Sequence, residues 1–131
     1  GGSLKKFYVD ATFDKHTHIS FVGFCDLSMS GSVQKLKFKD NNLAEIFAVS
    51  LCIKSLPKDL SCVILTDSQK AVDHYKNNQL LPEGVQIEHI PRALNIADGF
   101  IRAYKEEHNV NKRHFAETKE AKKQKAFAKN S

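Results

Sequence analysis

The sequence predicts an α/β fold in which helices cover both faces of a mixed five-stranded sheet, with three antiparallel strands followed by two parallel ones. Two observations support this prediction. Strand-like alternation of apolar and polar residues dominates the chain up to residue 39, and strands alternate with helices after residue 40. Alternating strands and helices give parallel strands joined by right-handed crossovers. The predicted element order is βββαβαβα.

The first three strands are predicted from a period of two residues. Apolar and polar side chains alternate over 6–13, 18–25 and 32–39. The turn-prone segment 28–32 separates the second run from the third. We therefore expect these three strands to form an antiparallel meander.

The second half of the chain is divided by helix breakers. Pro57 follows one helical pattern, and Pro82-Glu-Gly84 precedes the last strand pattern. The expected elements are helix 41–55, strand 61–66, helix 68–77, strand 85–90 and a helix from about 95 to 108.

Length and composition favour one soluble domain. The chain has 131 residues, of which 41% are hydrophobic, and no apolar run approaches the roughly 18 residues of a membrane span. We expect no membrane partner. The three cysteines, Cys25, Cys52 and Cys62, are odd in number and form no CxxC pair, so we expect neither disulfides nor a zinc knuckle. A reducing, intracellular and cytoplasmic location fits best.

Positive charge is concentrated at the C-terminus. Residues 112–131 contain seven Lys or Arg and two Glu, so they account for the whole net charge of +5. The expected domains are a cloning scar at 1–3, a folded domain at 4–109 and a basic tail or helix at 110–131. Such a tail can bind phosphate backbones through counterion release, and the alternative is a solvated terminus.

Four acidic residues occupy positions where a lone carboxylate is costly. Asp10 lies inside the first strand pattern, and Glu45 lies in a helical segment that is otherwise apolar or small apart from Ser50. Asp67 ends the apolar run of the fourth strand, and Asp98 opens the last helix. Because ligands bind at the carboxyl ends of strands in open α/β sheets, these acids are candidates for one site.

Each acid also has a structural explanation. Asp10 is explained as a charge on an edge strand. Glu45, together with Asn41 or Asn42, and Asp67 are explained as helix caps, and Asp98, together with Asn95, as part of a capping box. If the four converge, however, their repulsion requires neutralising cations. Oxygen ligands favour Mg²⁺ or Mn²⁺, and two such ions form a site for phosphoryl transfer.

The same acids lie in motifs that resemble those of a known family. The motifs are Tyr8-Val-Asp10-Ala-Thr12, Asn41-Asn-Leu-Ala-Glu45, Leu65-Thr-Asp-Ser-Gln69 and the segment from His89 to Asp98. In this order, with the predicted elements between them, they resemble the type 1 ribonucleases H and the ribonuclease H domains of reverse transcriptases. The resemblance covers residues 5 to about 105, and it implies a ribonuclease H-like fold.

The resemblance implies that Asp10, Glu45, Asp67 and Asp98 are catalytic residues that bind two Mg²⁺ ions, with Mn²⁺ as a possible substitute. It also implies an endonuclease that hydrolyses the RNA strand of an RNA–DNA hybrid and leaves 5′-phosphate and 3′-hydroxyl ends. Positions where the family contacts the hybrid correspond to Thr12, Asn41, Asn42 and Gln69. Arg92 is either a phosphate contact or an ordinary surface residue.

The sequence departs from the family at several points. There is room for only one helix between Ser68 and Val85, so the basic protrusion of some members is missing, and the basic tail is a hypothetical substitute. The spacing from Asn95 to Asp98 is one residue shorter than in many relatives. The enzyme either stands alone or belongs to a larger polymerase. The alternative functions are a catalytically silent binding module and a DNA-cutting relative of the same fold.

Overall fold

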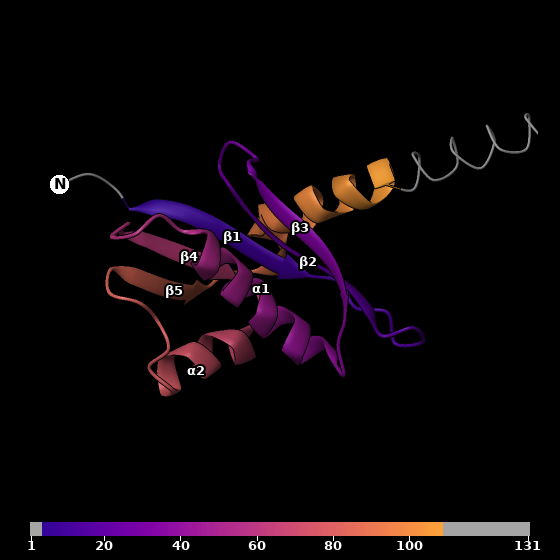
Figure 1. Cartoon of the computed structure of the whole chain (residues 1–131), viewed down its shortest axis with the longest axis horizontal. Helices are drawn as coiled ribbons and strands as arrows, with labels where there is room; N and C mark the ends of the chain where they lie inside the picture. The colour runs from indigo at the N-terminus through magenta and orange to yellow at the C-terminus, as the bar shows by residue number, and fades with distance from the viewer. Residues whose placement is uncertain (1–3, 109–131) are drawn as a thin grey trace, which may run out of the picture. The chain divides into compact units, whose positions relative to one another are not determined.

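The computed structural model describes residues 4–108. The expected scar at 1–3 and the basic tail at 110–131 lie outside the described residues. The predicted α/β fold is confirmed, with a single five-stranded mixed sheet in the spatial order β3-β2-β1-β4-β5 (Figure 1). Its strands are β1 (Lys5–Ala11), β2 (Ile19–Asp26), β3 (Gly31–Lys37), β4 (Cys62–Thr66) and β5 (Val85–His89).

The helices also follow the predicted order. They are α1 (Asn41–Ser55), α2 (Gln69–Asn77), the short 3-10 helix η1 (Arg92–Leu94), which the sequence pattern did not predict, and a helix that starts at residue 96. The predicted strands and the first two helices begin and end within two residues of the observed ones. None of the described helices has the length and hydropathy that a bilayer span requires.

The pairing of β1 places two of the acids side by side. β1 is the middle strand of the sheet, antiparallel to β2 and parallel to β4. In the parallel register Tyr8 lies opposite Leu65. Asp10 and Asp67 each follow two residues later, so they come level at the carboxyl ends of the two strands.

One face of the sheet is covered by α1 and α2 (Figure 1). The residues of α1 that pack there include the small side chains Ala44, Ala48 and Cys52, all fully buried. Small side chains allow the helix axis to approach the strands closely. The core beneath it is completed by Val9, Val22, Phe24, Ile64 and Ile87, among others.

Ile101, in the helix that starts at residue 96, packs against the other face of the sheet. Val22 and Phe24 belong to the core under α1, so the intervening Gly23 faces the opposite side of β2. A Cβ on Gly23 would lie 3.2 Å from Cγ1 of the fully buried Ile101 and 2.8 Å from the carbonyl oxygen of Ser32. Only glycine allows this close approach.

The compact unit that contains the sheet ends at Ile101. The second unit begins at Arg102, and its described part, residues 102–108, is helical. Within it the rings of Tyr104 and His108 stack with centroids 6.1 Å apart. The site described below lies wholly in the first unit.

Candidate metal centre

Asp67 directly follows β4, and the next residue, not Asp67, caps α2. Ser68 is the N-cap of α2, and its hydroxyl accepts a hydrogen bond from the Ala71 backbone N–H at 3.1 Å. The Ser68 backbone N–H in turn donates to Thr66 Oγ1 at 3.1 Å. The capping role that the sequence offered for Asp67 is therefore wrong.

Glu45 is likewise free of a capping role. The N-cap of α1 is Asp40, whose Oδ1 accepts from the Leu43 backbone N–H at 2.9 Å, so the expectation that Asn41 or Asn42 caps the helix is wrong. Glu45 lies in the second turn and is only 7% exposed. Its carboxylate is buried where the N-terminal part of α1 reaches the strand ends.

Three of the predicted acids converge. Asp10, Glu45 and Asp67 each offer a carboxylate oxygen, and these oxygens all lie within 4.8 Å of one another. They come from β1, α1 and the end of β4, so the fold itself assembles the group. Asp10 is 5% exposed and is not a charge on an edge strand, because β1 lies in the middle of the sheet.

Burial and mutual repulsion strongly perturb two of these carboxyls. Burial is the main cause that raises the pKa of Asp10 to about 7; Asp67 and Asp98 raise it further, whereas the Ala11 backbone N–H and Arg92 oppose the shift. The pKa of Glu45 is raised to about 9, first by burial and then by Asp10 and Asp67. Negative charge at this site is therefore costly unless a cation is bound.

The donor set fits a hard divalent cation. All the candidate ligands are carboxylate oxygens, which suit Mg²⁺ and Mn²⁺. Within the described part of the chain, the buried Oε2 of Glu45 has no hydrogen-bond partner. A buried acceptor left without a donor is expensive, and a cation would satisfy it.

The start of the last helix brings the fourth acid to the site. Asn95 is 4% exposed; its Nδ2 donates to the Val9 carbonyl at 2.9 Å, and its Oδ1 accepts from the Ala97 backbone N–H at 3.1 Å. The cap predicted at Asn95 is therefore confirmed, and it also ties the helix to β1. Asp98 is not in the close group of three acids, but it lines the same pocket.

The acids form part of a pocket of about 610 Å³. It brings together all four predicted acids and the predicted substrate residues Thr12, Asn41 and Arg92. The predicted residues Asn42 and Gln69 are exposed and are not among its lining. The Gln69 side chain instead donates to Asp73 Oδ1 at 2.9 Å.

Two pocket residues in the β1–β2 connection, Phe13 and Lys15, were not predicted from the sequence. Asp14 shapes this turn, because its Oδ1 accepts from the backbone N–H groups of His16 at 2.8 Å and Thr17 at 3.1 Å. Lys15 thereby joins Arg92 as a second cation in the lining. Its position in the connection that follows a strand ending at the site was the available signal.

The pocket thus combines an acidic group suited to divalent cations with two basic side chains suited to an anion. A phosphodiester anion has the charge to interact with cations bound at the acids and with these basic side chains. Comparison of the chain with protein-family models and with curated proteins found no match.

Proposed function

We propose that this protein is an endonuclease that hydrolyses the RNA strand of RNA–DNA hybrids with two bound Mg²⁺ or Mn²⁺ ions, leaving 5′-phosphate and 3′-hydroxyl ends. One observation carries the proposal: carboxylate oxygens of Asp10, Glu45 and Asp67 lie within 4.8 Å of one another. These are three of the four acids that the resemblance to ribonucleases H identifies. A ribonuclease H-like fold is the corresponding proposal for the architecture.

In this proposal the acids hold the cations. Asp10, Glu45 and Asp67 are the principal ligands, and Asp98 completes the set from the last helix. The chemistry that two bound divalent cations supply is acidification of water and stabilisation of negative charge on the leaving oxygen. Bound cations would keep Asp10 and Glu45 ionised, because their positive charge would offset the burial and the repulsion that raise the pKa values of these two carboxyls.

The basic residues of the pocket attract and orient the phosphodiester. Lys15 and Arg92 line the pocket from different segments, the β1–β2 turn and η1. A guanidinium can bind phosphate oxygens through two parallel hydrogen bonds, whereas an ammonium acts as a point charge. Two cations from separate segments therefore restrict how the anion enters.

The polar residues of the lining suit a ribose hydroxyl. Thr12 Oγ1 accepts from the Phe21 backbone N–H at 3.1 Å, and its own proton can then be donated to a ligand. Asn41, at the first position of α1, is exposed and offers both a donor and an acceptor. Such groups match the 2′-hydroxyl of RNA, which both donates and accepts. They read the sugar and not the base, so we expect little sequence preference.

The test is incubation of end-labelled RNA–DNA hybrid, duplex DNA and duplex RNA with the protein and Mg²⁺. We expect cleavage of the hybrid alone, with the RNA strand cut. The variant Glu45→Gln should lose activity by at least about 100-fold, since it removes one cation ligand. Glu88→Gln is the matched control, because Glu88 is exposed on β5 and does not line the pocket.

Each other outcome contradicts the proposal in a distinct way. Cleavage of duplex DNA with the hybrid left intact would identify a DNA-cutting enzyme of this fold. Binding of all three nucleic acids without cleavage, in Mg²⁺ and in Mn²⁺, would identify a silent binding module. Equal activity of Glu45→Gln and Glu88→Gln would show that cleavage does not depend on the acidic group.

A further inference from the structure

The edge strand β3 carries positive charge on the same sheet face as two residues of the pocket. Thr12 pairs with Phe21, since its backbone N–H donates to the Phe21 carbonyl at 2.9 Å, and Phe21 lies opposite Lys35 in the register of β2 and β3. Opposite residues of antiparallel strands point to the same face. Asp10 lies two residues before Thr12, and Lys37 lies two residues after Lys35. Because side chains alternate between the faces of a strand, both share this face.

The pocket and the charged part of β3 are close together. Neighbouring strands lie about 4.8 Å apart, so the backbone of Lys35 is roughly 10 Å from that of Thr12. A second connection runs along the chain, because Lys39 and Asp40 lead from the end of β3 directly to Asn41 in the pocket lining. The charged part of β3 therefore lies two strands from the pocket residues of β1 and ends four residues before Asn41 along the chain.

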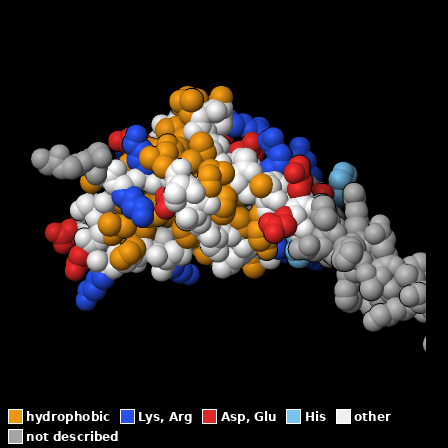
Figure 2. All heavy atoms as spheres, turned by 90° about the horizontal axis from the view of Figure 1, so that it is seen from above, with side chains coloured by type: hydrophobic (Ala, Val, Ile, Leu, Met, Phe, Trp, Pro, Cys, Tyr) orange, Lys and Arg blue, Asp and Glu red, His pale blue; other side chains and the backbone are white. Residues whose placement is uncertain are grey.

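Three lysines supply this charge. Residues 31–39 contain Lys35, Lys37 and Lys39 and no acidic residue, and all three side chains are exposed. No carboxylate among residues 4–108 forms an ion pair with any of them. In the view of Figure 2, Lys and Arg side chains gather in a band at the upper right of the described surface.

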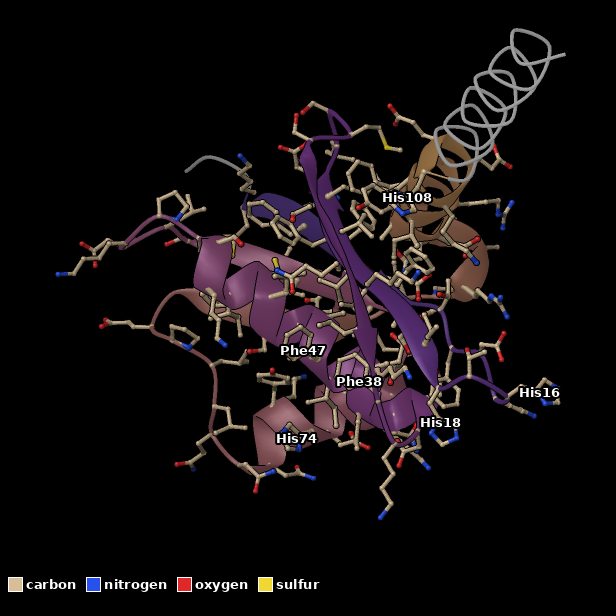
Figure 3. All side chains as sticks on the ribbon, turned by 45° about the vertical axis from the view of Figure 1, so that its right-hand side comes forward. His16, His18, Phe38, Phe47, His74 and His108 are labelled. Carbon is tan, nitrogen blue, oxygen red and sulfur yellow. The ribbon has the colours of Figure 1, made fainter. Side chains whose placement is uncertain are left out.

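Aromatic contacts hold both ends of the segment from Lys35 to Lys39. The ammonium of Lys35 lies 5.9 Å from the centroid of the Phe21 ring, a distance at which cation–π attraction operates. Between Lys37 and Lys39, the Phe38 ring packs against Phe47 of α1 with centroids 5.3 Å apart (Figure 3). The backbone that presents the lysines is therefore anchored, while their ammonium groups face solvent.

We propose that Lys35, Lys37 and Lys39, the β3 lysine track, bind the sugar–phosphate backbone of the nucleic-acid duplex whose phosphodiester occupies the pocket. The inference rests on the proposed function, and it assigns the β3 side of the pocket to a charge-based, sequence-independent contact. Each phosphate that a lysine neutralises releases condensed counterions. Exposed lysines on an edge strand can also serve only to block pairing with another sheet, and this role predicts a different result.

The experiment measures binding of labelled hybrid as a function of salt, in an Asp10→Asn background so that no cleavage occurs. The test variant carries Lys35→Gln, Lys37→Gln and Lys39→Gln. The control carries Lys54→Gln, Lys58→Gln and Lys76→Gln, which remove the same charge from exposed positions outside the pocket lining. Any contribution of the C-terminal tail is the same in both.

We expect the track variant to bind the hybrid about tenfold more weakly than the control at moderate salt. Its slope of log affinity against log salt should be smaller by roughly 2 to 3, because each lost phosphate contact removes about 0.9. Equal affinities and slopes for the two variants would overturn the proposal. If the parent protein cuts no hybrid but the slopes still differ, the proposed function fails and the lysine track stands as a nucleic-acid contact.

Discussion

Two carboxylates in the paired strands β1 and β2 have opposite surroundings. Asp26, opposite Phe7, accepts from Ser28 Oγ at 2.6 Å and from the Ser30 backbone N–H at 3.1 Å, and it lies 3.8 Å from the Lys5 ammonium. These contacts, led by the Ser28 hydroxyl, lower its pKa. Asp10, three residues after Phe7, is buried beside other acids, and its pKa is raised to about 7.

The difference separates a structural carboxylate from a candidate functional one. Around Asp26 the fold supplies donors and a cation, so the negative charge stabilises the turn between β2 and β3. Around Asp10 and Glu45 it supplies further carboxylates, so the same charge opposes folding until a cation binds. Destabilising charge kept inside a pocket is characteristic of functional sites.

The largest expected effect is on catalysis. Asp10→Asn or Asp67→Asn should reduce hybrid cleavage by at least about 1,000-fold, equivalent to roughly 4 kcal/mol of transition-state stabilisation, because each removes a cation ligand. Single-turnover assays of RNA cleavage in Mg²⁺ measure the effect. Asp59→Asn is the matched control: Asp59 is exposed, does not line the pocket and has a φ of 65°, which asparagine tolerates. Full activity of either site variant would contradict the assignment.

The next effect is on stability as a function of pH. Because the folded-state pKa values of Asp10 and Glu45 exceed the ordinary values of 3.8 and 4.5, both groups stabilise the metal-free protein fully below about pH 4. That stability is lost as pH rises through about 7 and then about 9. We expect a loss of several kcal/mol between about pH 4 and about pH 9, measured by urea unfolding in EDTA.

Divalent cations should reverse this loss. They bind the ionised carboxylates, so Mg²⁺ or Mn²⁺ should raise the unfolding free energy at pH 8 and have little effect at pH 5. The variant Glu45→Gln should show a flatter pH profile in EDTA and a weaker response to the cations. Stabilisation by Mg²⁺ that is equal at both pH values would contradict cation binding at these acids.

Much of the fold could be predicted from the sequence because its patterns are local. The periods of two and of about 3.6 residues identified every strand and both of the first helices, and Pro57 and Gly84 lie in the connections between elements. A three-residue 3-10 helix such as Arg92–Leu94 has no periodicity, so it was missed. The cap of α1 was misassigned because Asp40, Asn41 and Asn42 are all good caps, and the choice depends on where β3 ends.

The acidic character of the site was predictable from the sequence, and its geometry was not. Glu45, an acid in an apolar helix, pointed to a buried charge that needs a partner. The register of β1 on β4 that brings Asp10 level with Asp67 joins segments more than 50 residues apart, and no local pattern specifies it. Lys15 was missed for a different reason, because its place in the pocket depends on the conformation of the β1–β2 turn.

A smaller effect on cleavage is expected at Asp98, the fourth acid of the pocket. It lines the pocket outside the close group of three carboxylates. Asp98→Asn should therefore reduce cleavage by about 10- to 100-fold, less than Asp10→Asn, in the range typical of groups that support a metal centre from further out. The deficit should diminish as the Mg²⁺ concentration is raised. A loss as large as that of Asp10→Asn would place Asp98 among the principal ligands.

The smallest effect is expected at Asp26, whose negative charge stabilises the fold. Asp26→Asn keeps an oxygen acceptor for the turn but removes the charge that faces Lys5, so the Tm at pH 7 should fall by roughly 2–5 °C, and Asp26→Ala, which also removes the acceptor, should lower it further. Thermal unfolding in EDTA measures both.

In the same assay Asp10→Asn should raise the Tm, because it relieves burial and repulsion of a negative charge. A change in Tm of opposite sign for the same substitution, Asp to Asn, would show that the two carboxylates differ in the hydrogen-bond donors and acidic residues around them. A lower Tm for Asp10→Asn in EDTA would mean that the Asp10 charge stabilises the fold without a cation, which is the property assigned here only to Asp26.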